Sequence, residues 1–260
     1  MPYYSLKLPS VDKEIFTKQF SVRDCLDINY LISTNDIIGI DFFVEEKIKT
    51  YSNCTADLTV FDKFLYLFSQ SIFCDKDTIN INDGVDEDGT KIVKIINLIE
   101  AYNCFDTGTI QSKKRIKSGE IDIIFGLTSN FNDKEVVKVY SVGGEKIDYN
   151  IIPDLPISLY KEITEFYHIE NDKIDRDTFK KILRYKINLS SEVFIEILKF
   201  LFNENIKNHF DITFQLQKNY NFDIQYIESL TPKELSLYVL TVNNYVEEEN
   251  KKARERKNNL

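Results

Sequence analysis

Apolar and polar residues alternate near the start of the chain in a pattern that predicts a β-hairpin. The alternation covers residues 6–8 and 15–20, as in half-buried strands, and Pro9-Ser10 and Asp12 mark the turn between them. Ser21 then stands where a helix cap is expected, and Asp24 follows three residues later, close to a capping box. The N-terminus is therefore predicted to run strand, turn, strand and helix.

Helical periodicity continues in two further segments. One covers residues 37–51, and the other begins after Thr55 or Asp57 and includes residues 59–73. The second carries aromatic and aliphatic residues along one face, namely Phe61, Phe64, Leu65, Phe68 and Ile72. Such a stripe is far more often core than a binding groove, so we expect it to be buried.

The apolar period changes to two between about residue 77 and residue 151. We expect strands at residues 78–82, 91–100, 109–117, 120–128, 136–142 and 146–151. Turn dipeptides such as Asp83-Gly84, Asp88-Gly89 and Gly143-Gly144 separate them. This region is predicted to form an antiparallel sheet or a small sandwich.

Pro153 and Pro156 close the strand-rich region and mark the best linker candidate. Helices are expected at residues 156–167, 175–185 and 190–202, whereas residues 210–216 are ambiguous between helix and strand. The predicted fold class is therefore α+β. A mixed domain at 1–152, with a β-hairpin, helices and an antiparallel sheet, would precede a helical domain at 153–260.

The last predicted helix has the clearest local signal in the chain. Thr231 is its expected N-cap, Pro232 its first residue, and Glu234 completes a capping box. An apolar stripe follows, made of Leu235, Tyr238, Val239, Val242 and Tyr245. Residues 247–259 lack an apolar face, so we expect them to fray or to order only against a partner.

Charge argues against a duplex nucleic-acid binder. The 260 residues include 42 acidic and 33 basic side chains, giving a net charge of −9, whereas such binders usually present a basic face. The short basic run Lys113, Lys114, Arg115 and Lys117 is better explained as a solvated loop or hairpin edge. No apolar stretch approaches the ~20 residues of a membrane span, and no signal peptide is expected.

Catalytic, cofactor and metal patterns are not found in the sequence, so no such site is predicted. The four cysteines are too far apart for a C-x-x-C signature and are expected to be reduced: Cys25, Cys54, Cys74 and Cys104. His168 and His209 have no neighbouring pattern that would orient them for acid–base work. Residues 82–93 lack two of the strongest ligands of a calcium loop. Carboxylate catalysis by the many acidic residues stays open.

Both ends of the chain carry candidate partner-binding residues. At the N-terminus they are Tyr3, Tyr4, Leu6, Leu8, Phe16 and Phe20, and at the C-terminus they are Leu235, Tyr238, Val242 and Tyr245. Exposed aromatic side chains dominate interface hot spots, which favours a docking role. The competing interpretation of the first set is that the hairpin packs onto its own domain.

Short motifs at both ends of the chain form a recognisable set. The first group is Leu8-Pro9-Ser10, Phe20-Ser21-Val22-Arg23-Asp24, Cys54 and the block at residues 61–68, F-D-K-F-L-Y-L-F. The second is Leu230-Thr231-Pro232-Lys233-Glu234 with Tyr238. Together these motifs resemble the baseplate hub assembly proteins of T4-like phages, over about the first 80 residues and the last 30. Gln70-Ser71-Ile72 stands where that family usually has an Arg and a Ser. Some members also carry a C-x-x-C pair in the helical half, whereas no cysteine follows Cys104 in this sequence.

The resemblance implies a non-enzymatic role, as a tail baseplate hub component or as a hub assembly factor. Its implied partners are phage tail or baseplate hub proteins, with the tape-measure or tube protein as alternatives that the chain would chaperone. It would work in the host cytoplasm during assembly, with the virion tail as the alternative location. The alternative of another class is an enzyme or nucleic-acid factor with a site built from scattered acidic residues. Carboxylates of separated pKa in a cleft would favour the enzyme, and exposed apolar patches would favour the binding protein.

Overall fold

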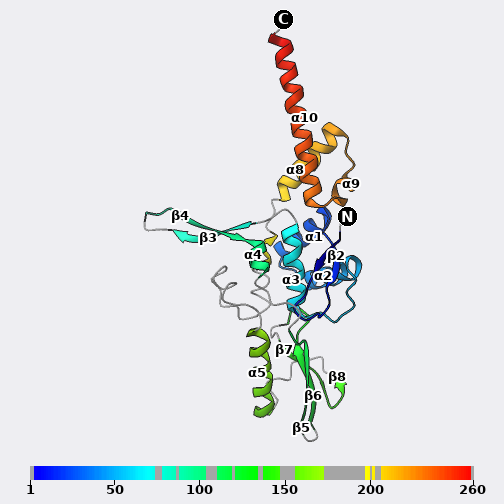
Figure 1. Cartoon of the computed structure of the whole chain (residues 1–260), viewed down its shortest axis with the longest axis vertical. Helices are drawn as coiled ribbons and strands as arrows, with labels where there is room; N and C mark the ends of the chain where they lie inside the picture. The colour runs from blue at the N-terminus through cyan, green and yellow to red at the C-terminus, as the bar shows by residue number, and fades with distance from the viewer. Residues whose placement is uncertain are drawn as a thin grey trace.

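The computed structural model describes residues 3–73, 78–85, 88–103, 110–118, 121–133, 137–146, 156–172, 197–199, 201–202 and 206–258. It confirms the predicted α+β class, because small antiparallel sheets and helices in the first part precede a helical C-terminal stretch. Figure 1 shows an elongated molecule in which helix α10 and the hairpin β3–β4 extend away from the central helices.

The N-terminus forms the predicted hairpin and helix. Strand β1 (Tyr3–Leu6) pairs antiparallel with β2 (Ile15–Lys18), in a register that sets Tyr3 opposite Lys18. Helix α1 (Val22–Ser33) follows. Its N-cap Ser21 accepts a hydrogen bond from the Asp24 backbone, and the Asp24 carboxylate accepts one from the Ser21 backbone, which completes the capping box.

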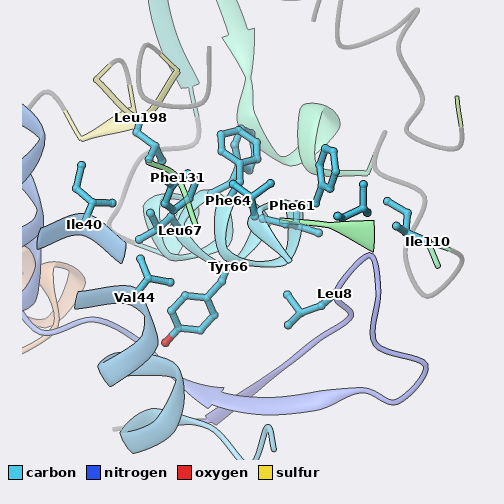
Figure 2. Close-up of a cluster of buried hydrophobic side chains, with 14 of the residues drawn as sticks. Leu8, Ile40, Val44, Phe61, Phe64, Tyr66, Leu67, Ile110, Phe131 and Leu198 are labelled. Atoms are coloured by element: carbon cyan, nitrogen blue, oxygen red, sulfur yellow. The ribbon is translucent and has the colours of Figure 1, made fainter. Parts of the chain in front are cut away.

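Helix α3 (Val60–Phe73) lies at the centre of the core, against α2 (Ile37–Tyr51). Every residue from 59 to 71 is buried, and Figure 2 shows Phe64, Tyr66 and Leu67 projecting from α3 in different directions. The helix begins later than either predicted start. Its cap is Thr59, whose backbone N–H donates to the Asp62 carboxylate over 2.7 Å.

The strand-rich region is antiparallel, as predicted, but its described strands form two separate sheets instead of one sheet or a sandwich. Strands β3 (Thr78–Val85) and β4 (Lys91–Asn97) make an isolated pair. The other sheet has the order β5-β6-β7-β8, formed by Lys113–Ser118, Ile121–Leu127, Val137–Val142 and Glu145–Lys146. Residues 147–151, the rest of the last predicted strand, lie outside the described residues.

Residues 98–100 were predicted as strand but belong to helix α4 (Leu98–Tyr102). The reason is the side chain of Asn97, whose oxygen accepts hydrogen bonds from the backbone N–H groups of Ile99 and Glu100, at 3.0 and 3.1 Å. This cap ends the extended backbone of β4 and starts a helical turn.

Helix α5 (Ile157–Asp172) packs against the four-stranded sheet, as the ring of Phe166 shows by meeting Phe125 edge-on at 5.2 Å (Figure 1). Two predicted helices follow in sequence. Residues 175–185 and most of residues 190–202 lie outside the described part of the chain.

The C-terminal helices are α8 (Ile206–Tyr220), α9 (Ile224–Ser229) and α10 (Pro232–Asn258). The ambiguous residues 210–216 are helical within α8, and α9 was not predicted. Thr231 and Glu234 make the expected capping box. The helix continues to Asn258 through the residues expected to fray, and its end projects from the molecule in Figure 1.

Buried apolar residues form a large cluster and a small one. The large cluster joins the N-terminal elements to α5 through Leu159, Ile163 and Phe166. The small one contains Val22, Leu216, Ile227 and Leu235. Packing therefore joins α5 to the N-terminal part of the chain. The linker expected near Pro153 lies at residues 151–155, outside the described residues.

Candidate interaction surface

The N-terminal hairpin presents one face to solvent and buries the other. Tyr3 and Phe16 are 60% and 51% exposed, on the outer face. Leu6, Leu8 and Phe20 belong to the large core cluster. A partner cannot reach these three side chains in the folded protein, and this corrects the expectation that they form part of a docking surface.

Aromatic packing explains why Phe20 is buried. Its ring meets those of Phe43 and Tyr66 edge-on, at centroid distances of 5.6 and 6.0 Å. Tyr4 is half-buried, and its hydroxyl lies 3.4 Å from that of Ser69 on α3. The hairpin therefore packs onto its own domain, with Tyr3 and Phe16 left on the outside.

The C-terminal candidates divide in a similar way. Leu235 is buried in the small cluster and Val242 is half-buried beside it, whereas Tyr238 and Tyr245 are exposed. The hydroxyl of Tyr238 lies 2.8 Å from that of Tyr226 on α9. The exposed candidates are thus Tyr238 and Tyr245.

The structure brings the start of α1 into contact with the α9–α10 connection. The Val22 backbone N–H at the start of α1 donates to the carbonyl of Leu230 over 2.7 Å. Val22 also packs in the small cluster, and Arg23 lies 3.6 Å from Glu228. The C-terminal helices therefore dock directly beside the end of the N-terminal hairpin, a juxtaposition across more than 200 residues that no local pattern signals.

Exposed apolar side chains are concentrated on the C-terminal helices. Ten of the twenty large hydrophobic residues found exposed in the described part of the chain fall between residues 210 and 246. Sequence reasoning missed most of them, including Phe210, Phe214, Leu237 and Leu240. Such a concentration is typical of a surface that meets another protein.

A groove of about 390 Å³ runs between α8 and α10. Leu216, Val239 and Val242 supply apolar side chains to it, and amides such as Gln215 and Asn243 also line it. An apolar floor with polar groups at its sides is the usual form of a site for an amphipathic helix.

Beyond the groove, α10 carries two blocks of opposite charge. Residues 247–249 are all glutamate, and residues 251–257 include five basic side chains and one acidic one. Residues 247–255 are exposed, and the charged atoms of Lys252 and Glu249 pair at 3.0 Å within the helix.

A second hollow, of about 670 Å³, lies between the loop before α3 and the four-stranded sheet. Lys49, Cys54, Lys113 and Tyr140 are among its lining residues. Burial raises the pKa of the Cys54 thiol, so it is not activated as a thiolate nucleophile. The Lys113 ammonium is engaged by Asp57 at 3.1 Å and by the Tyr140 ring at 4.7 Å.

Two buried carboxylates have pKa values shifted in opposite directions, but neither lines this hollow. Burial raises the pKa of Asp41, against the ammonium of Lys63 at 3.2 Å. Burial also opposes ionisation of Asp24, but the ammonium of Lys47 at 2.8 Å and the Tyr51 hydroxyl outweigh it, so that the pKa of Asp24 is lowered. Both carboxylates, Asp24 on α1 and Asp41 on α2, thus form ion pairs with lysine side chains.

The two histidines and the basic run at residues 113–117 lie on different elements. His168 is exposed on α5, and burial lowers the pKa of His209 on α8, which contacts Thr213 at 3.3 Å. Residues 113–117 lie on β5, an edge strand of its sheet, where Arg115 and Lys117 pair with Asp122. The basic run therefore lies on a hairpin edge, which is one of the two placements that the sequence predicted.

Within the described residues, no group of three His, Cys, Asp or Glu side chains is placed to hold a metal ion. No helix in the same part of the chain is both long and apolar enough to cross a membrane. No protein-family model, curated protein or solved structure matches this chain.

Proposed function

We propose that this chain is a protein-binding assembly factor, and that its partners are phage tail baseplate proteins. The observation that carries the binding role is the apolar stripe of α10, which becomes exposed at Val246, together with the open groove between α8 and α10. Burying such surface against a partner is favourable, at roughly 25 cal/mol per Å² of apolar area.

The assignment to a baseplate rests on the motifs at the two ends. Asp24 and the Thr231–Glu234 pair cap α1 and α10, and the α9–α10 connection docks onto the start of α1. Two of the motifs that carry the resemblance, at residues 20–24 and 230–234, therefore meet at one junction of the fold, whereas the motifs at residues 8–10 and 61–68 contribute to the large core cluster.

The test is affinity capture of the tagged chain from cells that produce phage tails, with mass spectrometry of the recovered proteins. We expect hub, tube or tape-measure proteins to be recovered. The control is a chain that ends at Leu230, which lacks α10 but keeps the large core cluster. Recovery should be lost with this control while its thermal transition persists. Equal recovery with the control, or no tail protein with the full chain, would overturn the proposal.

A further inference from the structure

Building on the proposed function, we propose that the α8–α10 groove and the adjoining stripe of α10 bind one amphipathic helix of a partner protein. The partner helix would carry an apolar stripe, then a basic turn, and then an acidic turn. Its apolar stripe would face the apolar stripe of α10, its basic turn the glutamates that follow, and its acidic turn the basic residues beyond them.

The apolar part of the site is a stripe on α10 that is buried at the start of the helix and becomes exposed toward its C-terminus. Leu235, Val239, Val242 and Val246 follow one another at spacings of four, three and four residues, which places them on one face. Leu235 is only 8% exposed beside Leu216 of α8, whereas Val246 is 36% exposed. The stripe thus emerges from the small cluster into solvent, where a second helix can cover it.

The groove supplies the polar contacts that would orient a bound helix. Gln215 and Asn219 stand on α8 and Asn243 on α10, around the apolar side chains of the groove. Amide side chains both donate and accept hydrogen bonds, so they suit the polar flanks of an amphipathic helix. Asp211 adds a negative charge to the lining.

Charge sets the order of the partner's residues. Of the three glutamates at 247–249, Glu249 follows Val246 by three residues and continues the face of the stripe, so the partner helix needs a basic side chain next to its apolar stripe. The basic residues at 251–257 then require acidic side chains one turn further on. The same order repels a helix whose charged turns are exchanged.

A second copy of α10 does not meet these requirements. An antiparallel pair that sets Val242 opposite Val246 also sets Glu249 opposite Val239. An antiparallel pair that matches Glu249 with Lys252 sets Val246 opposite Glu255. A parallel pair aligns the glutamates with one another. Apolar contact and charge pairing therefore need different registers, which points to a different chain as the occupant.

The probe is a set of synthetic peptides of about 20 residues, long enough to form a helix. The matched peptides carry a leucine stripe, a lysine turn and a glutamate turn, made in both chain directions. The exchanged peptides have the two charged turns swapped. Binding to the full chain is measured by fluorescence anisotropy, and we expect one matched peptide to bind at least about tenfold more tightly than either exchanged one.

Two variants of α10 locate the binding face. Val246→Asp places a charge in the stripe and should weaken binding of the matched peptide about tenfold or more. Leu240→Asp is the matched control, since Leu240 is an exposed apolar residue that lies about 120° around the same helix from Val246 and does not line the groove. It should leave binding unchanged. Glu249→Lys should abolish the preference for the matched peptide, because Glu249 follows Val246 by three residues and lies on the same face of α10.

Absence of binding, equal binding of matched and exchanged peptides, or equal loss with both aspartate variants would overturn the inference. A dimer in light scattering that Val246→Asp dissociates would also overturn it, because the occupant would then be a second copy. Peptide binding without capture of tail proteins would refute the proposed function alone. Capture that survives Val246→Asp, without peptide binding, would refute the docking site alone.

Discussion

Neighbouring aromatic residues of the N-terminal segment have opposite roles. Phe20 is fully buried among three aromatic rings, whereas Phe16 points outward from β2. We expect Phe20→Ala to lower the free energy of unfolding by about 3–5 kcal/mol, because it leaves a cavity. Phe16→Ala should change it by less than about 0.5 kcal/mol. Urea unfolding measures both, and similar losses would contradict this division of the hairpin.

Asp24 should give stability a defined pH dependence. Its carboxylate accepts from the Ser21 backbone and the Tyr51 hydroxyl, at 2.8 and 2.7 Å, and pairs with Lys47. Its pKa is lowered from 3.8, so its stabilisation is present above about pH 4 and is lost as the pH falls through the lowered value.

The Asp24→Asn variant tests this dependence. At pH 7 it should be less stable than the wild type by about 2 kcal/mol, since the ion pair with Lys47 is lost. The difference should shrink as the pH falls below 4. Thermal unfolding between pH 2 and pH 7 measures the difference, and a gap that stays constant would show that Asp24 does not titrate as described.

At the scale of elements, the outer part of α10 should contribute little to stability. Residues 247–255 are exposed, and the described contacts of α10 with the rest of the fold lie near its base, around Leu235. Deleting residues 247–260 should change the free energy of unfolding by less than about 0.5 kcal/mol, while helical circular dichroism decreases.

The control for this deletion is Leu235→Ala, which removes a buried side chain from the small cluster. It should destabilise the C-terminal helices by about 2 kcal/mol. A large loss of stability on deletion would mean that the charged end of α10 packs on another part of the protein.

Elements with strong local signals were predicted well from the sequence. The bounds of α2 are the predicted ones, and the capping boxes at Ser21 and Thr231 are confirmed. Errors arose where one side chain or a tertiary contact decided the structure. Asn97 ends β4 and starts α4, and α9 is too short for its period to show.

The candidate surface was predicted only in part. Period-two alternation correctly separates Phe16 from its buried neighbours in β2, but the partner-binding set included Leu6 and Phe20. Exposure of Phe210 and Leu240 depends on which faces of α8 and α10 meet. That is decided by packing between helices, so helical periodicity alone does not reveal it.

At the scale of the whole molecule, the N-terminal and C-terminal helices meet at a single junction. The connection between α9 and α10 docks onto the start of α1, and α10 extends outward from that point (Figure 1). The net charge of −9 makes copies of the chain repel one another, which opposes self-association. A partner helix bound along the outer part of α10 would contact the exposed Tyr3 and Phe16 only if another part of the partner reached back to the hairpin.

Site-specific photo-cross-linking tests the binding role most directly. A benzophenone amino acid is placed at position 246 in one chain and at position 240 in another, and each is expressed in cells that assemble phage tails. We expect position 246 to cross-link to a tail baseplate protein and position 240 to give little product. Cross-links only between copies of this chain, or no product from position 246, would contradict a partner-binding role for the C-terminal helices. Equal products from both positions would contradict the assignment of the binding face to the stripe that contains Val246.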